Sequence, residues 1–314
     1  MLSSFHINPE VTDPKTLFDG TDPLTMMGFQ SLFEKCEISG ILFFGGREKE
    51  RVLQNVREWP DDYNTLRERL IQIVSNSPRI VESDEKLNVD GHVQGEEENC
   101  RNFVCSELFH INQFEQSKIS RRMAEYHQGG IQLAETEPER VSEIFNDFLR
   151  YADEINYFDA VIGKIRHSMK YHYKESLVWF LKLWKQTRPS LRRFTIFTTV
   201  PYQLEFITDD QERLDAENKN EDKIREVRRF IREIGRESGV RVRIYFKNDP
   251  NNRLHDRKLE HRYGIITIGM GLNLGKRGGQ VGNHFRDNTI NLAMHETAKK
   301  QVRDCKRLEN YEEK

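Results

Sequence analysis

Three consecutive residues near the C-terminal end of the chain, His255, Asp256 and Arg257, have side chains suited to phosphate chemistry. A histidine can act as a nucleophile on phosphorus, and a guanidinium can bind a phosphate through two parallel hydrogen bonds. Three interpretations of His255 are open: a nucleophile, a phosphate ligand, or a structural histidine bonded to neighbouring strands. Arg257 either binds an anion or pairs with Asp256.

Further candidates follow downstream of this tripeptide. Lys276-Arg277, followed by two glycines, forms a basic loop that either cradles a phosphate or is a solvated connection. His295-Glu296-Thr297 either brings His295 to face His255 across a cleft or simply begins a helix, whose dipole suits an acidic first turn. The segment Gly269-Met270-Gly271 predicts a tight turn, because neither a GxGxxG fingerprint nor a P-loop is present.

In their order and spacing, these motifs resemble the phospholipase-D-like domain found C-terminal to microtubule-interacting-and-trafficking modules. That family carries an HDR tripeptide, a strand ending in an IGxGL turn, and a late HET tripeptide before its last helix. The corresponding residues here are His255-Asp256-Arg257, Ile268-Gly269-Met270-Gly271-Leu272 and His295-Glu296-Thr297. The resemblance covers about residues 140–314. For the domain expected over residues 136–314 it implies an α/β fold: an open, largely parallel sheet with helices on both faces.

Phospholipase D enzymes use an H-x-K-x4-D motif. Its histidine attacks phosphorus, its lysine holds the phosphate oxygens, and the histidine of a second copy protonates the leaving group. Here His255 matches that histidine and Arg257 replaces the lysine, whereas Arg262 occupies the position of the aspartate. The sequence holds one copy of the motif, so catalysis would need a dimer or His295 as the second histidine.

This degenerate motif favours a non-catalytic binding or scaffold module. The expected ligand is a phosphate-bearing molecule, either a nucleic acid or a phospholipid headgroup, and a partner protein is the other interpretation. The expected phosphate-binding residues are His255, Arg257, Lys276 and Arg277. The alternative function is a metal-independent phosphodiesterase or nuclease that uses His255, Arg257 and His295. The resemblance also implies a homodimer, and no cofactor is expected.

Alternating strands and helices must position these residues. The first three expected elements are a helix over 140–151, a strand over 155–162 and a helix over 176–185. A strand over 194–199, a helix over 222–236 and strands over 240–246 and 264–268 follow. The last expected element is a helix over 296–307. Sheets of this kind place ligands at the carboxyl ends of their strands, and His255 lies just beyond such an end. We expect Trp179, Phe180 and Leu183 to be buried between sheet and helices.

Residues 1–135 predict a smaller α/β or α+β domain of unknown role. The first twenty residues read as an irregular lead-in. Helices are expected over 24–34, 47–59, 63–75 and 117–126, and strands over 37–46 and 103–108. The acidic segment 82–99 is expected to be a surface loop or linker. An unrelated domain fused to a phospholipase-D-like module is typical of prokaryotic multi-gene systems, such as defence systems.

Charge divides the chain unevenly. Residues 1–150 hold 16 Lys and Arg against 27 Asp and Glu, a balance of −11, whereas residues 151–314 hold 33 against 24, a balance of +9. The asymmetry reflects either two domains with different surfaces or an anionic partner for the second half. The four scattered cysteines predict no metal site and a reduced, cytoplasmic protein. No apolar run approaches the roughly 20 residues of a transmembrane helix.

Overall fold

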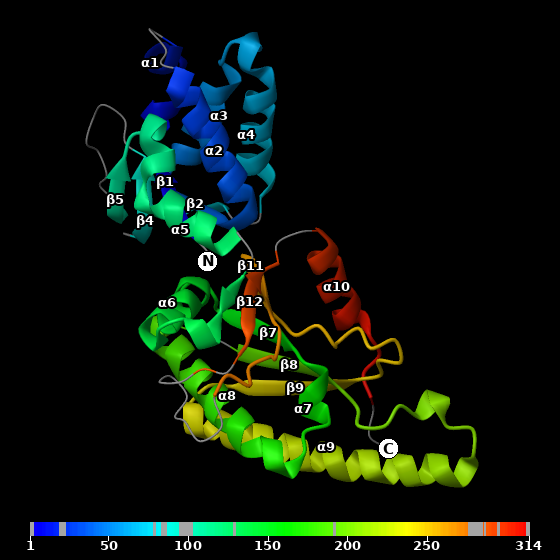
Figure 1. Ribbon diagram of the computed structural model, residues 1–314. Coiled ribbons are helices and arrows are strands. Elements are labelled where there is room, and N and C mark those ends of the chain that lie inside the picture. Colours follow the sequence, from blue (N-terminus) through cyan, green and yellow to red (C-terminus); the bar gives the residue numbers. More distant parts are fainter. Residues whose placement is uncertain are drawn as a thin grey trace. The chain divides into compact units, whose positions relative to one another are not determined.

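The computed structural model describes residues 3–18, 23–77, 80–82, 87–93, 103–127, 130–190, 193–275, 285, 287–293 and 296–311. The chain divides into two compact units, Met1–Gln128 and Gly129–Lys314 (Figure 1). The domain boundary expected at residue 135 lies after the observed division, because Ile131–Gln132 already pairs with a strand of the second unit. Among the residues described, no helix combines the length and the apolar character that crossing a membrane requires.

A five-stranded parallel sheet with the order β3-β2-β1-β4-β5 organises the first unit. Its strands are β1 (Ser3–Ile7), β2 (Gly40–Phe44), β3 (Ile80–Glu82), β4 (Leu87–Val93) and β5 (Phe103–Phe109). The expected irregular lead-in is wrong for Ser3–Ile7, which form the central strand β1. Every residue of β1 is buried, so both of its faces are covered and its sequence shows no alternation.

The expected acidic loop over residues 82–99 is wrong for Leu87–Val93, which is strand β4 between β1 and β5. Leu87, Val89 and Val93 alternate with polar residues, and Val93 is fully buried. The acidic composition of the segment masked this short period-two pattern. The rest of the segment, apart from Glu82 in β3, lies outside the described residues.

The helices of the first unit surround an apolar core. They are α1 (Pro14–Phe18), α2 (Pro23–Ser39), α3 (Glu48–Arg57), α4 (Asn64–Asn76) and α5 (Lys118–His127), with short 3₁₀ helices η1 (Pro9–Thr12), η2 (Asp61–Tyr63) and η3 (Ile111–Gln116). Phe5, Phe29 and Trp59 are fully buried in this core, and the Trp59 indole donates to the Thr12 carbonyl at 2.9 Å. α2 continues to Ser39, so the strand expected from residue 37 begins only at Gly40.

The second unit contains a seven-stranded sheet with the order β6-β12-β11-β10-β7-β8-β9. Its strands are β6 (Ile131–Gln132), β7 (Glu154–Phe158), β8 (Arg193–Thr199), β9 (Val242–Lys247), β10 (Lys258–His261), β11 (Gly264–Ile268) and β12 (Thr289–Leu292). Only β7–β8 and β8–β9 pair in parallel. The sheet is therefore mixed rather than largely parallel, because a two-residue turn folds β10 and β11 into a hairpin beside β7.

Helices cover both faces of this sheet. They are α6 (Pro138–Leu149), α7 (Ala160–Gly163), α8 (His167–Thr187), α9 (Asp210–Ser238) and α10 (Glu296–Arg307), with η4 (Leu133–Glu135) and η5 (Leu204–Phe206). Phe194 of β8 packs against Trp184 of α8, whereas Phe197 joins the cluster formed by α10. Residues three apart in a strand point to opposite faces, so α8 and α10 lie on opposite sides.

Helix α8 is longer than expected and turns a different stripe inward. It begins at His167, nine residues before the expected start at residue 176. Phe180 is fully buried as expected, but Trp179 and Leu183 are only half-buried. Trp184 is fully buried instead. The strand expected over 155–162 ends at Phe158, and its remainder is α7.

Candidate functional site

The loop between β9 and β10 holds the His255 segment in a fixed conformation. Both carboxylate oxygens of the buried Asp249 accept backbone hydrogen bonds at 2.8 Å, one from Arg253 and one from Leu254. Leu254 is itself fully buried against α10. The next three residues therefore follow an anchored stretch of backbone.

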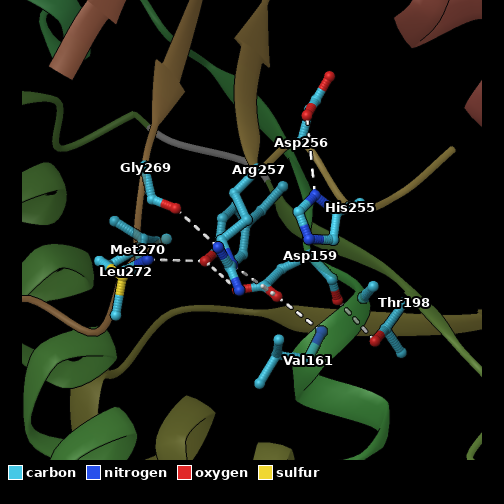
Figure 2. A network of polar contacts seen from close by, with 12 residues as sticks. Asp159, Val161, Thr198, His255, Asp256, Arg257, Gly269, Met270 and Leu272 are labelled. Atoms are coloured by element: carbon cyan, nitrogen blue, oxygen red, sulfur yellow. Dashed lines mark hydrogen bonds and ion pairs between the residues drawn. The ribbon is translucent and has the colours of Figure 1, made fainter. Parts of the chain in front are cut away.

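Arg257 is directed into the protein rather than toward solvent. Its Nη1 donates to the carbonyl of Gly269 at 2.6 Å, and its Nε lies 3.5 Å from Oδ1 of Asp159 (Figure 2). The Arg257 side chain is 17% exposed and that of Asp159 is 0% exposed. The acidic partner of Arg257 is therefore Asp159 rather than its sequence neighbour Asp256.

Asp159 is the centre of a buried polar network. It follows β7 and caps α7, with Oδ1 accepting from the Val161 amide at 2.8 Å. Its Oδ2 accepts from the Tyr157 hydroxyl at 2.5 Å and from the Tyr173 hydroxyl at 3.4 Å. The Asp159 carbonyl accepts from the Thr198 hydroxyl at 2.7 Å. This carboxylate is thus hydrogen-bonded through both oxygens.

Burial controls the protonation of the network. It raises the pKa of the Asp159 carboxyl above its ordinary value, against the opposing effects of the Tyr157 hydrogen bond and of Arg257. Burial and the neighbouring Asp159 also raise the pKa of Tyr157 well above its ordinary value. Tyr157 therefore stays protonated and serves as a hydrogen-bond donor.

The glycine turn after β11 closes over this network. The Leu272 amide donates to the Tyr157 hydroxyl at 2.7 Å. Gly271 has a φ of +66°, and a Cβ placed there would lie 2.5 Å from the Tyr157 hydroxyl and 2.6 Å from Arg257 Cδ. Only glycine fits this position. The turn therefore packs against the Arg257 side chain.

His255 lies outside the network. Its side chain is 68% exposed, and its Nδ1 is 3.9 Å from Oδ1 of Asp256. It borders an open hollow of about 410 Å³ that is also lined by Asp256, Asp304 and Gln301. The ammonium of Lys258 lies 3.5 Å from Asp256. The imidazole therefore shares this hollow with two carboxylates. The guanidinium of Arg257 is directed to Asp159 and Gly269 instead (Figure 2).

The remaining predicted site residues are not described. Lys276, Arg277 and His295 lie outside the described residues, so the structure does not place them relative to His255. Arg262, which the resemblance aligns with the phospholipase D aspartate, is in the β10–β11 turn, and its guanidinium lies 5.3 Å from the ring centroid of Tyr263. Asp159 was not predicted from the sequence. Its position between an apolar strand and a short helix was the only pattern that could have indicated it.

No protein-family model, curated protein or solved structure matches this chain. The geometry of the described residues is therefore the basis for the functional proposal.

Proposed function

We propose that residues 136–314 form a non-catalytic, phospholipase-D-like binding module for a phosphate-bearing ligand. The observation that carries this proposal is the engagement of Arg257 with Asp159 and Gly269. A phospholipase D mechanism needs the cation and the histidine to hold the same phosphate. In this chain the two side chains have separate partners.

The energetic balance also disfavours phosphate binding by Arg257. A charge-assisted hydrogen bond to a ligand contributes roughly 1.5–3 kcal/mol. Withdrawing the guanidinium would leave Asp159 buried without its cation, and breaking a buried pair in this way costs about 3–5 kcal/mol. A phosphate beside His255 would also lie near the carboxylates of Asp256 and Asp304. The cost of separating Arg257 from Asp159 therefore exceeds the gain from a hydrogen bond to phosphate.

The charge balance of the second half supports an anionic ligand. The excess of +9 over residues 151–314 attracts phosphate-bearing molecules by long-range electrostatics. Such a ligand is expected to bind at surface cations that have no acidic partner, because those cations gain a counter-charge on binding.

Binding of the full chain to short DNA and RNA strands and to phosphoinositide liposomes tests the proposal. We expect measurable binding to at least one of these, weakened by added salt. Arg257→Ala should lower the melting temperature while its folded fraction keeps the wild-type affinity. An Arg257→Ala protein of unchanged melting temperature that loses affinity ten- to hundredfold would place the phosphate at Arg257 and contradict the proposal.

A further inference from the structure

A second hollow, of about 510 Å³, lies in the C-terminal unit and is lined by none of the residues of the His255 segment. Its walls are the Lys164–Arg166 segment after α7, Pro201 and Tyr202 after β8, and part of α9. It thus lies beyond the carboxyl ends of the parallel strands β7 and β8, the edge at which α/β sheets bind ligands. Its volume is within the roughly 300–1,000 Å³ of small-molecule sites.

Both acidic residues of the hollow are already neutralised by neighbours. Glu226 accepts hydrogen bonds from the ammonium groups of Lys170 and Lys223, and Asp222 accepts from Arg225 at 3.0 Å. These lysines, Lys170 first, hold the pKa of Glu226 below its ordinary value. Glu226 therefore remains ionised, but its charge is matched.

Three cationic side chains of the hollow have no acidic partner among the described residues. The side chains of Lys164, Arg166 and Lys219 are exposed, and none forms an ion pair or hydrogen bond with another described residue. The hollow therefore carries uncompensated positive charge. Phosphate is an anion that lysine and arginine side chains bind well.

The segment that carries Lys164 and Arg166 is held rigidly. The Gly163 amide donates to the Thr198 hydroxyl at 2.7 Å, and that hydroxyl in turn donates to the Asp159 carbonyl. A Cβ at Gly163 would overlap the Thr199 carbonyl, so α7 approaches β8 closely. Ile165 is fully buried between the two cations. The backbone positions of Lys164 and Arg166 are therefore fixed before a ligand binds, which lowers the entropic cost of binding.

Tyr202 gives the hollow an aromatic wall. Its side chain is 47% exposed. Asn220 of α9, which is fully buried, accepts from the Tyr202 amide and donates to the Tyr202 carbonyl, both at 2.9 Å. The α9 side chain thus fixes the backbone of this one loop residue. An exposed tyrosine ring on a fixed backbone is a stacking platform for a planar base.

We propose that this hollow binds a nucleotide. Its phosphates contact Lys164, Arg166 and Lys219, and its base stacks on Tyr202. The inference deepens the proposed function, on which it rests, by naming the ligand class and its site. The stacking surface distinguishes a nucleotide from an inositol phosphate headgroup, which offers phosphates but no planar ring.

Calorimetric titration of the full chain with ATP in EDTA tests the assignment. Lys164→Ala and Arg166→Ala should each weaken binding roughly tenfold, and Tyr202→Ala roughly tenfold, whereas Tyr202→Phe keeps the affinity. Lys182→Ala and Tyr171→Ala remove an exposed cation and an exposed ring of α8 outside the hollow and should change Kd less than twofold. Inorganic triphosphate should bind more weakly than ATP.

Several results would overturn the assignment. One is an unchanged Kd in the Lys164→Ala/Arg166→Ala double variant with an unaltered melting temperature. Another is equal affinity for triphosphate and ATP together with no effect of Tyr202→Ala, which would indicate a polyphosphate site. Binding to phosphoinositide liposomes without binding to ATP would refute the nucleotide and leave the proposed function standing. Hydrolysis that depends on His255, with ATP still bound at Tyr202, would refute the non-catalytic function and leave the nucleotide site standing.

Discussion

At the scale of single residues, the buried network shows how Arg257, an arginine of the kind that binds phosphate, stabilises a buried carboxylate instead. The Asp159 carboxylate is fully buried, and four groups compensate it: the guanidinium of Arg257, the Val161 amide and two tyrosine hydroxyls. A buried charge persists only when it is paired and hydrogen-bonded in this way. Arg257 thereby links the β9–β10 loop to the end of β7.

The raised pKa of Asp159 makes a prediction about pH. A carboxyl whose folded pKa lies above its unfolded value binds more protons when folded, so stability falls as pH rises from the unfolded value of 3.8 through the folded pKa. Asp159→Asn removes this contribution. Urea unfolding from pH 4 to pH 8 should therefore show a smaller loss of stability with pH in Asp159→Asn than in the wild type. Parallel curves for the two proteins would show that Asp159 does not titrate anomalously.

At the scale of elements, the Gly269–Leu272 turn depends on one glycine and tolerates change at the other. Gly271→Ala places a methyl group against Tyr157 and Arg257 at positive φ, and should lower the free energy of unfolding by at least about 2 kcal/mol. Gly269→Ala is the matched control, because its Cβ would meet no atom closer than 3.5 Å. Denaturant unfolding compares the two; equal destabilisation would contradict the described turn.

Helix α8 offers a second matched pair. Trp184 is fully buried, and its indole donates to the Ala152 carbonyl at 2.8 Å, whereas Trp179 is half-buried. Trp184→Ala should therefore cost about 3–5 kcal/mol, and Trp179→Ala clearly less. Melting temperatures of the two variants are the measurement. A larger loss for Trp179→Ala would mean that the helix turns a different face to the sheet.

Sequence patterns located the helices better than the strands. The final helix was expected over residues 296–307, and α10 has these bounds. Strands β10 and β12 have four residues each, too few for a periodic pattern to emerge, and β1 begins with two serines that are buried in the sheet. Short strands are specified mainly by their partners, which sequence alone does not show.

The candidate site illustrates the same limit. The residue types of the His255 segment could be recognised from the sequence. The pairing of Arg257 with Asp159, 98 positions earlier, could not be recognised from the sequence, because it depends on the pairing of strands β10 and β7. The second hollow likewise joins Lys164, Tyr202 and Lys219 from three separate segments. Each is unremarkable in its own stretch of sequence.

At the scale of the whole molecule, the two units predict where a protease cuts. β4 is an inner strand of the first sheet and is hydrogen-bonded on both sides, so cleavage within Leu87–Val93 requires unfolding of that unit. Limited proteolysis followed by mass spectrometry should instead yield fragments that end near Gln128, where the units divide. Initial cleavage within Leu87–Val93 would contradict the parallel sheet.

The central claim is that the His255-Asp256-Arg257 segment does not support catalysis, and a single ratio tests it. The measurement is the phosphodiesterase rate of the wild type on a labelled oligonucleotide in EDTA, divided by the rate of His255→Ala at equal concentration. A histidine that takes part in acid–base or nucleophilic catalysis contributes typically 10²–10⁴-fold. Because His255 is exposed beside two carboxylates and apart from Arg257, we predict a ratio of about one. A ratio of about one hundred or more, with both proteins folded, would contradict the account.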